Sequence, residues 1–145
     1  MTTTHKPIGP LYGGDDFRFH IQIVDENKIP YDLSKLNWIK WLLHNDEGLI
    51  WEHEFLLSHA DAAAGRLMVW LPHADTTRFP GGLYTDFLRI NCNGIVSTLL
   101  TGPITIIADP WKASVAVAPF AAMAHTENVV VMLDRRERVR RRRAA

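Results

Sequence analysis

A dense cluster of arginines occupies residues 134–145 of the sequence. Seven Arg stand there with two acidic residues, which gives the segment a charge of +5. The remaining residues, 1–133, hold nine basic and 14 acidic side chains, so they carry −5 although the formal net charge of the chain is zero. Guanidinium groups bind both carboxylates and phosphates. The segment therefore predicts a partner that is either an acidic protein surface or a nucleic acid.

An apolar run, Asn128 to Leu133, directly precedes the arginines and is typical of a β-strand. An exposed run of this kind is an aggregation hazard unless it pairs with an open sheet edge. We expect the two segments together to bind a neighbouring protein or another copy of the chain. The predicted partner-binding residues are Val129, Val130, Val131, Leu133, Arg135, Arg136, Arg138, Arg140, Arg141, Arg142 and Arg143. No aromatic residue lies among the arginines, so nucleic-acid binding there is expected to be non-specific.

Residues that support catalysis or metal binding are scattered along the rest of the chain. The seven His form no pair at strand (i, i+2) or helical (i, i+4) spacing, and no Ser lies in a Gly-x-Ser-x-Gly context. Glu52 and Glu54 share a strand face, which we interpret as a solvated face. The lone Cys92 is expected to pack as a small core residue. We expect no enzyme activity, no catalytic or metal site and no cofactor.

Five Trp raise an alternative function, because exposed aromatic rings on a sandwich can stack on sugars. Trp38 and Trp41 are three residues apart on a predicted strand, so they face opposite ways and one of them is available for a glycan. Trp51 or Trp70 could join it. The alternative reading of the chain is thus a module that binds glycans on a host surface.

The elements that position these residues are predicted to be strands. Phe17, Phe19, Ile21 and Ile23 alternate with polar residues, which indicates a half-buried strand. Further predicted strands span residues 36–44, 49–57, 66–71, 83–92 and 95–108, the last as a pair or as one kinked strand. Hairpin loops are predicted at 45–48 and 93–94, and a helical turn or loop at 58–65. No apolar run approaches the roughly 18 residues of a membrane span, so no membrane partner is expected.

This spacing of about seven short strands predicts an all-β, immunoglobulin-like antiparallel β-sandwich. We expect three parts: an N-terminal arm over residues 1–13, the sandwich over 14–110, and an extended C-terminal arm with the Arg-rich end over 111–145. Gly81 and Gly82 lead into Tyr84, which predicts a tyrosine corner whose hydroxyl reaches a backbone group.

Several motifs together resemble the immunoglobulin-like virion domains of tailed bacteriophages, particularly the amino-terminal domain of siphophage baseplate upper proteins. They are Gly14-Asp-Asp-Phe17, Tyr31-Asp-Leu-Ser34, Gly65-Arg-Leu-Met-Val-Trp-Leu-Pro72, Phe79-Pro-Gly-Gly-Leu-Tyr-Thr-Asp-Phe87 and Thr98-Leu-Leu-Thr-Gly-Pro-Ile-Thr-Ile-Ile107.

The resemblance covers roughly residues 14–109 and implies a structural protein of the virion, assembled in the host cytoplasm. Such a protein docks onto other virion proteins and copies of itself in the tail, baseplate or neck. A capsid decoration protein is the alternative that keeps the same fold. The Ala-rich segment and the arginines stand where that family carries a long extension.

Overall fold

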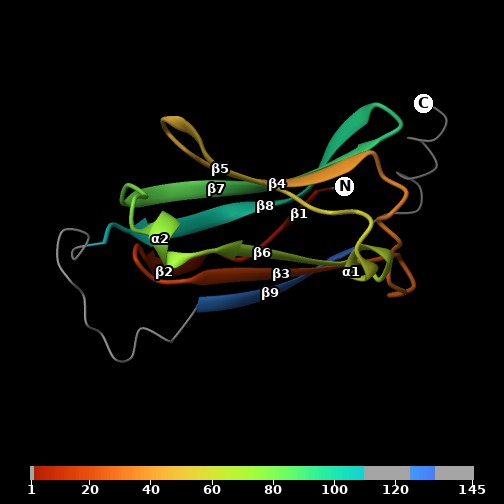
Figure 1. Ribbon diagram of the computed structural model, residues 1–145, viewed down its shortest axis with the longest axis horizontal. Coiled ribbons are helices and arrows are strands. Elements are labelled where there is room, and N and C mark those ends of the chain that lie inside the picture. The colour runs from red at the N-terminus through yellow and green to blue at the C-terminus, as the bar shows by residue number, and fades with distance from the viewer. Residues whose placement is uncertain (1, 110–124, 133–145) are drawn as a thin grey trace.

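The computed structural model describes residues 2–109 and 125–132 and consists almost wholly of strands (Figure 1). The elements are β1 (Thr3–Thr4), β2 (Ile8–Tyr12), β3 (Phe17–Val24), β4 (Trp38–Asn45), β5 (Gly48–Glu54), α1 (Ala60–Ala63), β6 (Arg66–Leu71), α2 (His73–Thr76), β7 (Gly82–Cys92), β8 (Ile95–Ile107) and β9 (His125–Met132). No helix in these ranges is long and apolar enough to cross a membrane. The predicted all-β class is confirmed.

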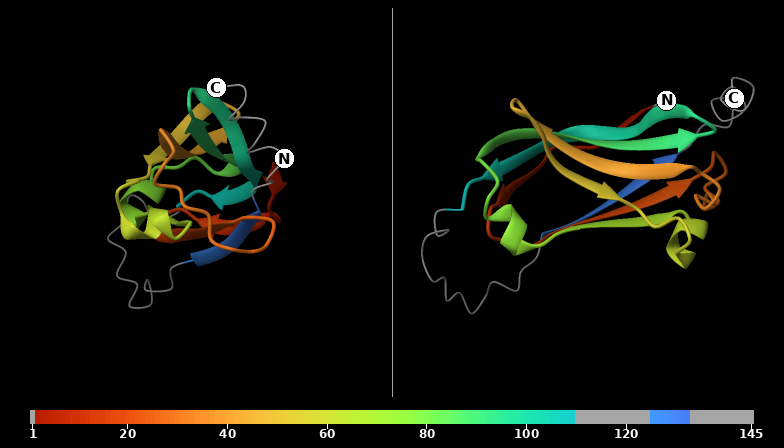
Figure 2. Two further views of the ribbon diagram at one scale, coloured as in Figure 1. Left: turned by 90° about the vertical axis from the view of Figure 1, so that its right-hand side faces the viewer. Right: turned by 45° about the horizontal axis from the view of Figure 1, so that its top comes forward.

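Two sheets lie face to face as a sandwich (Figure 2). The larger sheet has the order β1-β8-β7-β4-β5, with β2 also paired to β8, and the smaller sheet has the order β6-β3-β9. Neighbouring strands are antiparallel within β8-β7-β4-β5 and between β3 and β6, as predicted. The terminal strands differ from the prediction, because β1 and β2 run parallel to β8, and β9 runs parallel to β3.

The core lies between the sheets and is built mainly by alternation of buried and exposed residues along the strands, although Leu99 and Leu100 of β8 are both buried. In β3 the residues Phe17, Phe19, Ile21 and Ile23 are buried, while Arg18 is exposed. Facing residues of β4, β7 and β8, such as Trp41 and Leu88, complete the core. Removing a large apolar side chain from water contributes about 1.5–3 kcal/mol, so this shared interior is the main source of stability.

The turns agree in part with the predictions. The Asn93-Gly94 hairpin between β7 and β8 is present, and residues 95–107 form one continuous strand, the second of the two options. The β4–β5 loop is shorter than predicted, because Asn45 already pairs with Gly48. Cys92 is half-exposed at the end of β7, so its expected place in the core is wrong.

The tyrosine corner is confirmed. Tyr84 is 1% exposed, and its hydroxyl donates a hydrogen bond to the Pro80 carbonyl at 2.5 Å. Gly82 takes the positive φ that admits the chain to β7, whereas Gly81 does not. Phe87 points to the opposite face of β7 from Tyr84, as the alternation requires.

Both terminal strands occupy the same flank of the sandwich. Leu11 of β2 and His125 of β9 line one cavity, and His5 lies close enough to Glu127 for the carboxylate to influence its charge. The predicted N-terminal arm is therefore an edge of the larger sheet, and part of the predicted C-terminal arm is an edge of the smaller one.

Candidate interaction surfaces

The outer face of the smaller sheet exposes large apolar side chains. Met68 and Trp70 on β6 are each 47% exposed, and Val130 and Met132 on β9 are 63% and 50% exposed. Polar side chains of β3, including His20, lie between these two strands on the same face. A face with this composition is typical of a surface that contacts another molecule.

The predicted partner-binding residues fall partly on this surface. Val129, Val130 and Val131 lie in β9, where Val131 is buried between the sheets and Val130 points outward. The run therefore forms the strand that its composition predicts, and it pairs with β3 of its own chain. Leu133, Arg135, Arg136, Arg138, Arg140, Arg141, Arg142 and Arg143 lie outside the described residues.

The outward-facing edge of β9 carries no partner strand among the described residues, since β9 pairs with β3 alone. Its outward N–H and C=O groups are a template for a further strand. Natural edges are commonly protected by Pro or Lys, and β9 contains neither residue. The edge and the exposed face thus form one continuous candidate docking surface.

The glycan-binding residues predicted from the sequence are separated by the structure. Trp41 is fully buried and donates a hydrogen bond from Nε1 to Asp86 at 2.9 Å, so its proposed contact with a glycan is wrong. Trp38 lies on the other face of β4, as predicted, with the Lys40 ammonium 4.7 Å from its ring centre. Trp70 instead presents the exposed indole.

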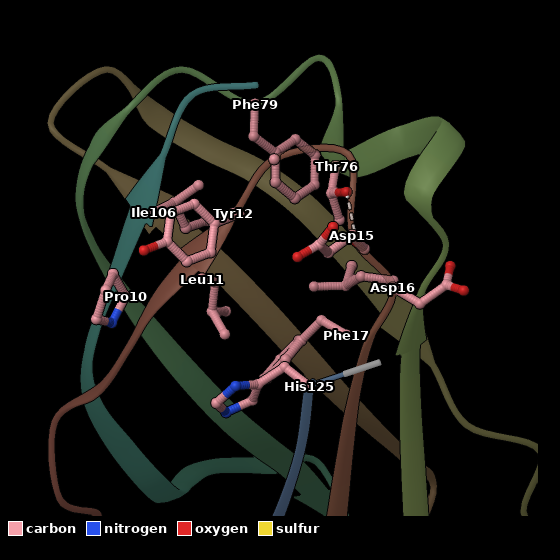
Figure 3. Close-up of a pocket in the computed structure, with 12 residues that line it drawn as sticks. Pro10, Leu11, Tyr12, Asp15, Asp16, Phe17, Thr76, Phe79, Ile106 and His125 are labelled. Atoms are coloured by element: carbon pink, nitrogen blue, oxygen red, sulfur yellow. Dashed lines mark hydrogen bonds between the residues drawn. The ribbon is translucent and has the colours of Figure 1, made fainter. Parts of the chain in front are cut away.

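A cavity of about 250 Å³ opens at the end of the sandwich where β3 and β9 begin (Figure 3). Apolar side chains form its walls: Leu11, Phe17, Leu71, Phe79 and Ile106. The carboxylate of Asp15 points into it, whereas that of Asp16 turns outward. Asp16 accepts hydrogen bonds from the backbone N–H of His73 at 2.7 Å and contacts its ring.

The electrostatics of this end differ between the two carboxylates. Partial burial and the nearby charges of Asp109 and Asp16 raise the pKa of Asp15. Asp16 is partly desolvated, yet its hydrogen bonds from His73 lower its pKa. The end of the sandwich is thus acidic, and Asp15 is the carboxylate that lacks a neutralising neighbour among the described residues.

A buried polar cluster holds the N-terminal segment to the body. His5 Nε2 donates to Asp86 Oδ1 at 2.5 Å, His5 Nδ1 donates to the Lys6 carbonyl at 2.7 Å, and Trp41 donates to the second oxygen of Asp86. Asp86 is completely buried and His5 is 7% exposed. Sequence reasoning missed this cluster, because its members lie 45 and 81 positions from Asp86 and no local pattern links them.

The close approach of His5 requires Gly102. A Cβ at position 102 would overlap three atoms of the His5 imidazole ring, so only glycine leaves room for His5 on β8. Two ring nitrogens that both face acceptors are satisfied only by the imidazolium form. Burial lowers the pKa of His5, but the hydrogen bonds to Asp86 and Lys6 outweigh it and leave the pKa raised.

Within residues 2–109 and 125–132 no group of three His, Cys, Asp or Glu is arranged to hold a metal ion.

Comparison with known proteins finds no matching family model and no matching curated protein. Among solved structures, the Bacillus anthracis TIE protein is similar with a TM-score of 0.38 and 16% sequence identity over 81% of this chain. The chain spans 17% of that protein's chain. At this level of similarity the match identifies no family.

Proposed function

We propose that the chain is a non-enzymatic structural protein of a phage virion, a docking domain that binds neighbouring virion proteins. The observation that carries the docking role is the surface formed by β9 and the outer face of the smaller sheet. It combines an unpaired strand edge with the exposed side chains of Met68, Trp70, Val130 and Met132. A second protein that adds a strand to β9 would satisfy the backbone and cover these side chains together.

The virion assignment is supported by the sequence motifs that resemble immunoglobulin-like phage domains. The tail, the baseplate or the neck is the proposed location, and a capsid decoration protein is the alternative. The tyrosine corner and the sandwich are compatible with this assignment. They are shared by many domains, so particle association must be measured directly.

The test is incorporation of the tagged full chain into particles, expressed together with the genes of the particle and measured after density-gradient purification. We expect the wild-type chain to sediment with the particles. The double variant Val130→Lys with Met132→Lys places two charges on the docking surface and is expected to reduce incorporation at least about tenfold.

The matched control is Leu83→Lys with Val96→Lys. These side chains are 66% and 52% exposed and lie on the other sheet. Control and wild type should be incorporated equally. A wild-type chain that stays outside the particle fraction refutes the virion role, and equal incorporation of both double variants refutes docking through β9.

Glycan binding is a second proposed function, and the exposure of Trp70 favours it. The indole lies near enough to Asp16 to help lower the pKa of that carboxylate, and its ring lies on a face with polar neighbours such as Arg18 and His20. A glycan array should show binding that Trp70→Ala abolishes and Leu83→Ala leaves unchanged. Absence of binding by the wild-type chain contradicts this function.

A further inference from the structure

One end of the sandwich holds a cavity with acidic side chains, and the inference drawn from it rests on the proposed docking function. We propose that the cavity end of one copy binds residues 133–145 of a second copy, so that copies associate head to tail. The partner is thus a second copy of this chain, and the recognised ligand is an Arg-rich peptide. Four observations carry the proposal.

The first observation is the chemistry of the cavity. Its walls are mainly apolar, and its volume of about 250 Å³ is large enough for one or two side chains. The carboxylate of Asp15 points into it (Figure 3). A cavity with apolar walls and an acidic group at its mouth fits an arginine, whose stem of three methylenes is apolar and whose guanidinium forms a fork with a carboxylate.

The second observation is the unbalanced charge at this end. Asp15 lies near Asp16 and Asp109, and no cation or hydrogen-bond donor among the described residues contacts its carboxylate. Asp16 and Asp109 both have partners, from His73 and Thr77 respectively. An incoming guanidinium would relieve the repulsion that acts on Asp15, so the site favours a cationic ligand.

The third observation is the charge of the proposed occupant. Residues 133–145 contain seven Arg, two acidic residues and the apolar Val139, while the rest of the chain carries an excess of five negative charges. Opposite charges of this size accelerate association and favour the correct orientation. Val139 lies in the middle of the arginines and provides an apolar side chain for the cavity walls.

The fourth observation is where the two sites lie. The cavity is at the end where β9 begins, with His125 in its wall, and β9 ends at Met132 beside Val24 at the opposite end (Figure 1). The eight residues of β9 are extended, so the strand spans about 26 Å along the sandwich. Met132, where the described residues end, thus lies at the end of the sandwich opposite the cavity.

The expected assembly follows from this geometry. The cavity and the basic segment are different surfaces, so the contact is heterologous and produces a ring or an open chain of copies rather than a two-fold dimer.

The test uses sedimentation velocity on two full-length variants. Asp15→Lys places a cation at the cavity but keeps the basic segment, while the combined substitution of Arg140, Arg141, Arg142 and Arg143 by Glu keeps the cavity but reverses the segment. We expect the wild type to form oligomers and each variant to self-associate at least about tenfold more weakly. An equimolar mixture of the two variants should form hetero-oligomers that contain heterodimers, because the intact Arg segment of one variant meets the intact cavity of the other.

Asp61→Lys is the matched control, because Asp61 is exposed on α1 at the other end of the sandwich and the substitution changes the net charge equally. It should associate like the wild type. A monomeric wild type, or a mixture without heterodimers, overturns head-to-tail binding, and a compact monomer that expands in Asp15→Lys would show that the segment binds its own cavity. A monomeric wild type that is still incorporated into particles would overturn this inference while leaving the proposed docking function intact.

Discussion

The contact between His5 and Asp86 joins the N-terminal segment to the core through a charged pair. Asp86 is fully buried, so its carboxylate depends on donors from His5 and Trp41. Removing one partner of a buried charge leaves the other uncompensated. The stability of the fold should therefore depend on the protonation of His5. Neither the composition of the chain nor the periodicity of its strands indicates that this residue matters for stability.

The pH dependence of this pair is a prediction with a definite sign. The pKa of His5 is raised in the folded protein, so its contribution is complete below the ordinary value of 6.5 and is lost as the pH rises through the higher folded pKa. The variant His5→Gln keeps one donor but cannot be charged. In urea unfolding, wild type should exceed His5→Gln in stability by more at pH 6 than at pH 9. A difference that is constant with pH would contradict a titrating His5.

The tyrosine corner gives a second prediction at single-residue scale. Tyr84→Phe removes the donor to the Pro80 carbonyl while the ring stays in the core. We expect a loss of about 1 kcal/mol in the free energy of unfolding. Tyr12 is 51% exposed, and Tyr12→Phe is the control that should change stability by less than about 0.5 kcal/mol. Equal effects of the two variants would refute the corner as a stabilising contact.

At the scale of elements, the sequence predicted the central strands well and the terminal pairings poorly. The alternation in residues 17–23 defines a buried face by itself, and β3 has that face. The parallel pairing of β9 with β3 joins segments more than 100 positions apart, and alternation does not specify which edge a strand selects. The apolar run at 128–133 therefore predicted a strand without predicting that its own chain supplies the partner.

The packing of β9 can be tested through two adjacent valines. Val131 is 1% exposed and Val130 is 63% exposed. Val131→Ala should lower the free energy of unfolding by about 2 kcal/mol because it leaves a cavity between the sheets. Val130→Ala should change it by less than about 0.5 kcal/mol. Chemical unfolding of both variants measures the difference, and equal losses would contradict this register of β9 on β3.

The N-terminal strands can be displaced by a single methyl group on β8. Gly102→Ala places a Cβ against the His5 ring, which cannot shift without losing Asp86. We expect faster amide hydrogen exchange in residues 2–6, by at least about tenfold, with little change in β7. The control is Thr105→Ala, because Thr105 lies on the exposed face of the same strand, β8. Unchanged exchange in Gly102→Ala would contradict the close approach.

At the scale of the whole molecule, the division into arms and body changes. The sequence predicted arms at residues 1–13 and 111–145, because Pro and Gly in the first and Ala and Arg in the second interrupt strand patterns. The structure joins β1, β2 and β9 to the two sheets, since an edge accepts an irregular strand when one side of it faces solvent. The sandwich thus has its two terminal edges on one flank, and the acidic cavity lies at one end of it.

The charge of −5 on residues 1–133 and of +5 on residues 134–145 predicts how association of the full chain depends on salt. Screening shortens the range of charge interactions from about 10 Å at 0.1 M to about 3 Å at 1 M salt. If the acidic cavity end and the basic segment drive association, the sedimentation coefficient should fall as salt rises, while the melting temperature changes little because the core is apolar. Contacts through the exposed Met68 and Trp70 would instead persist or strengthen at high salt. A sedimentation series from 0.1 to 1 M salt therefore decides which of the two surfaces brings the copies together.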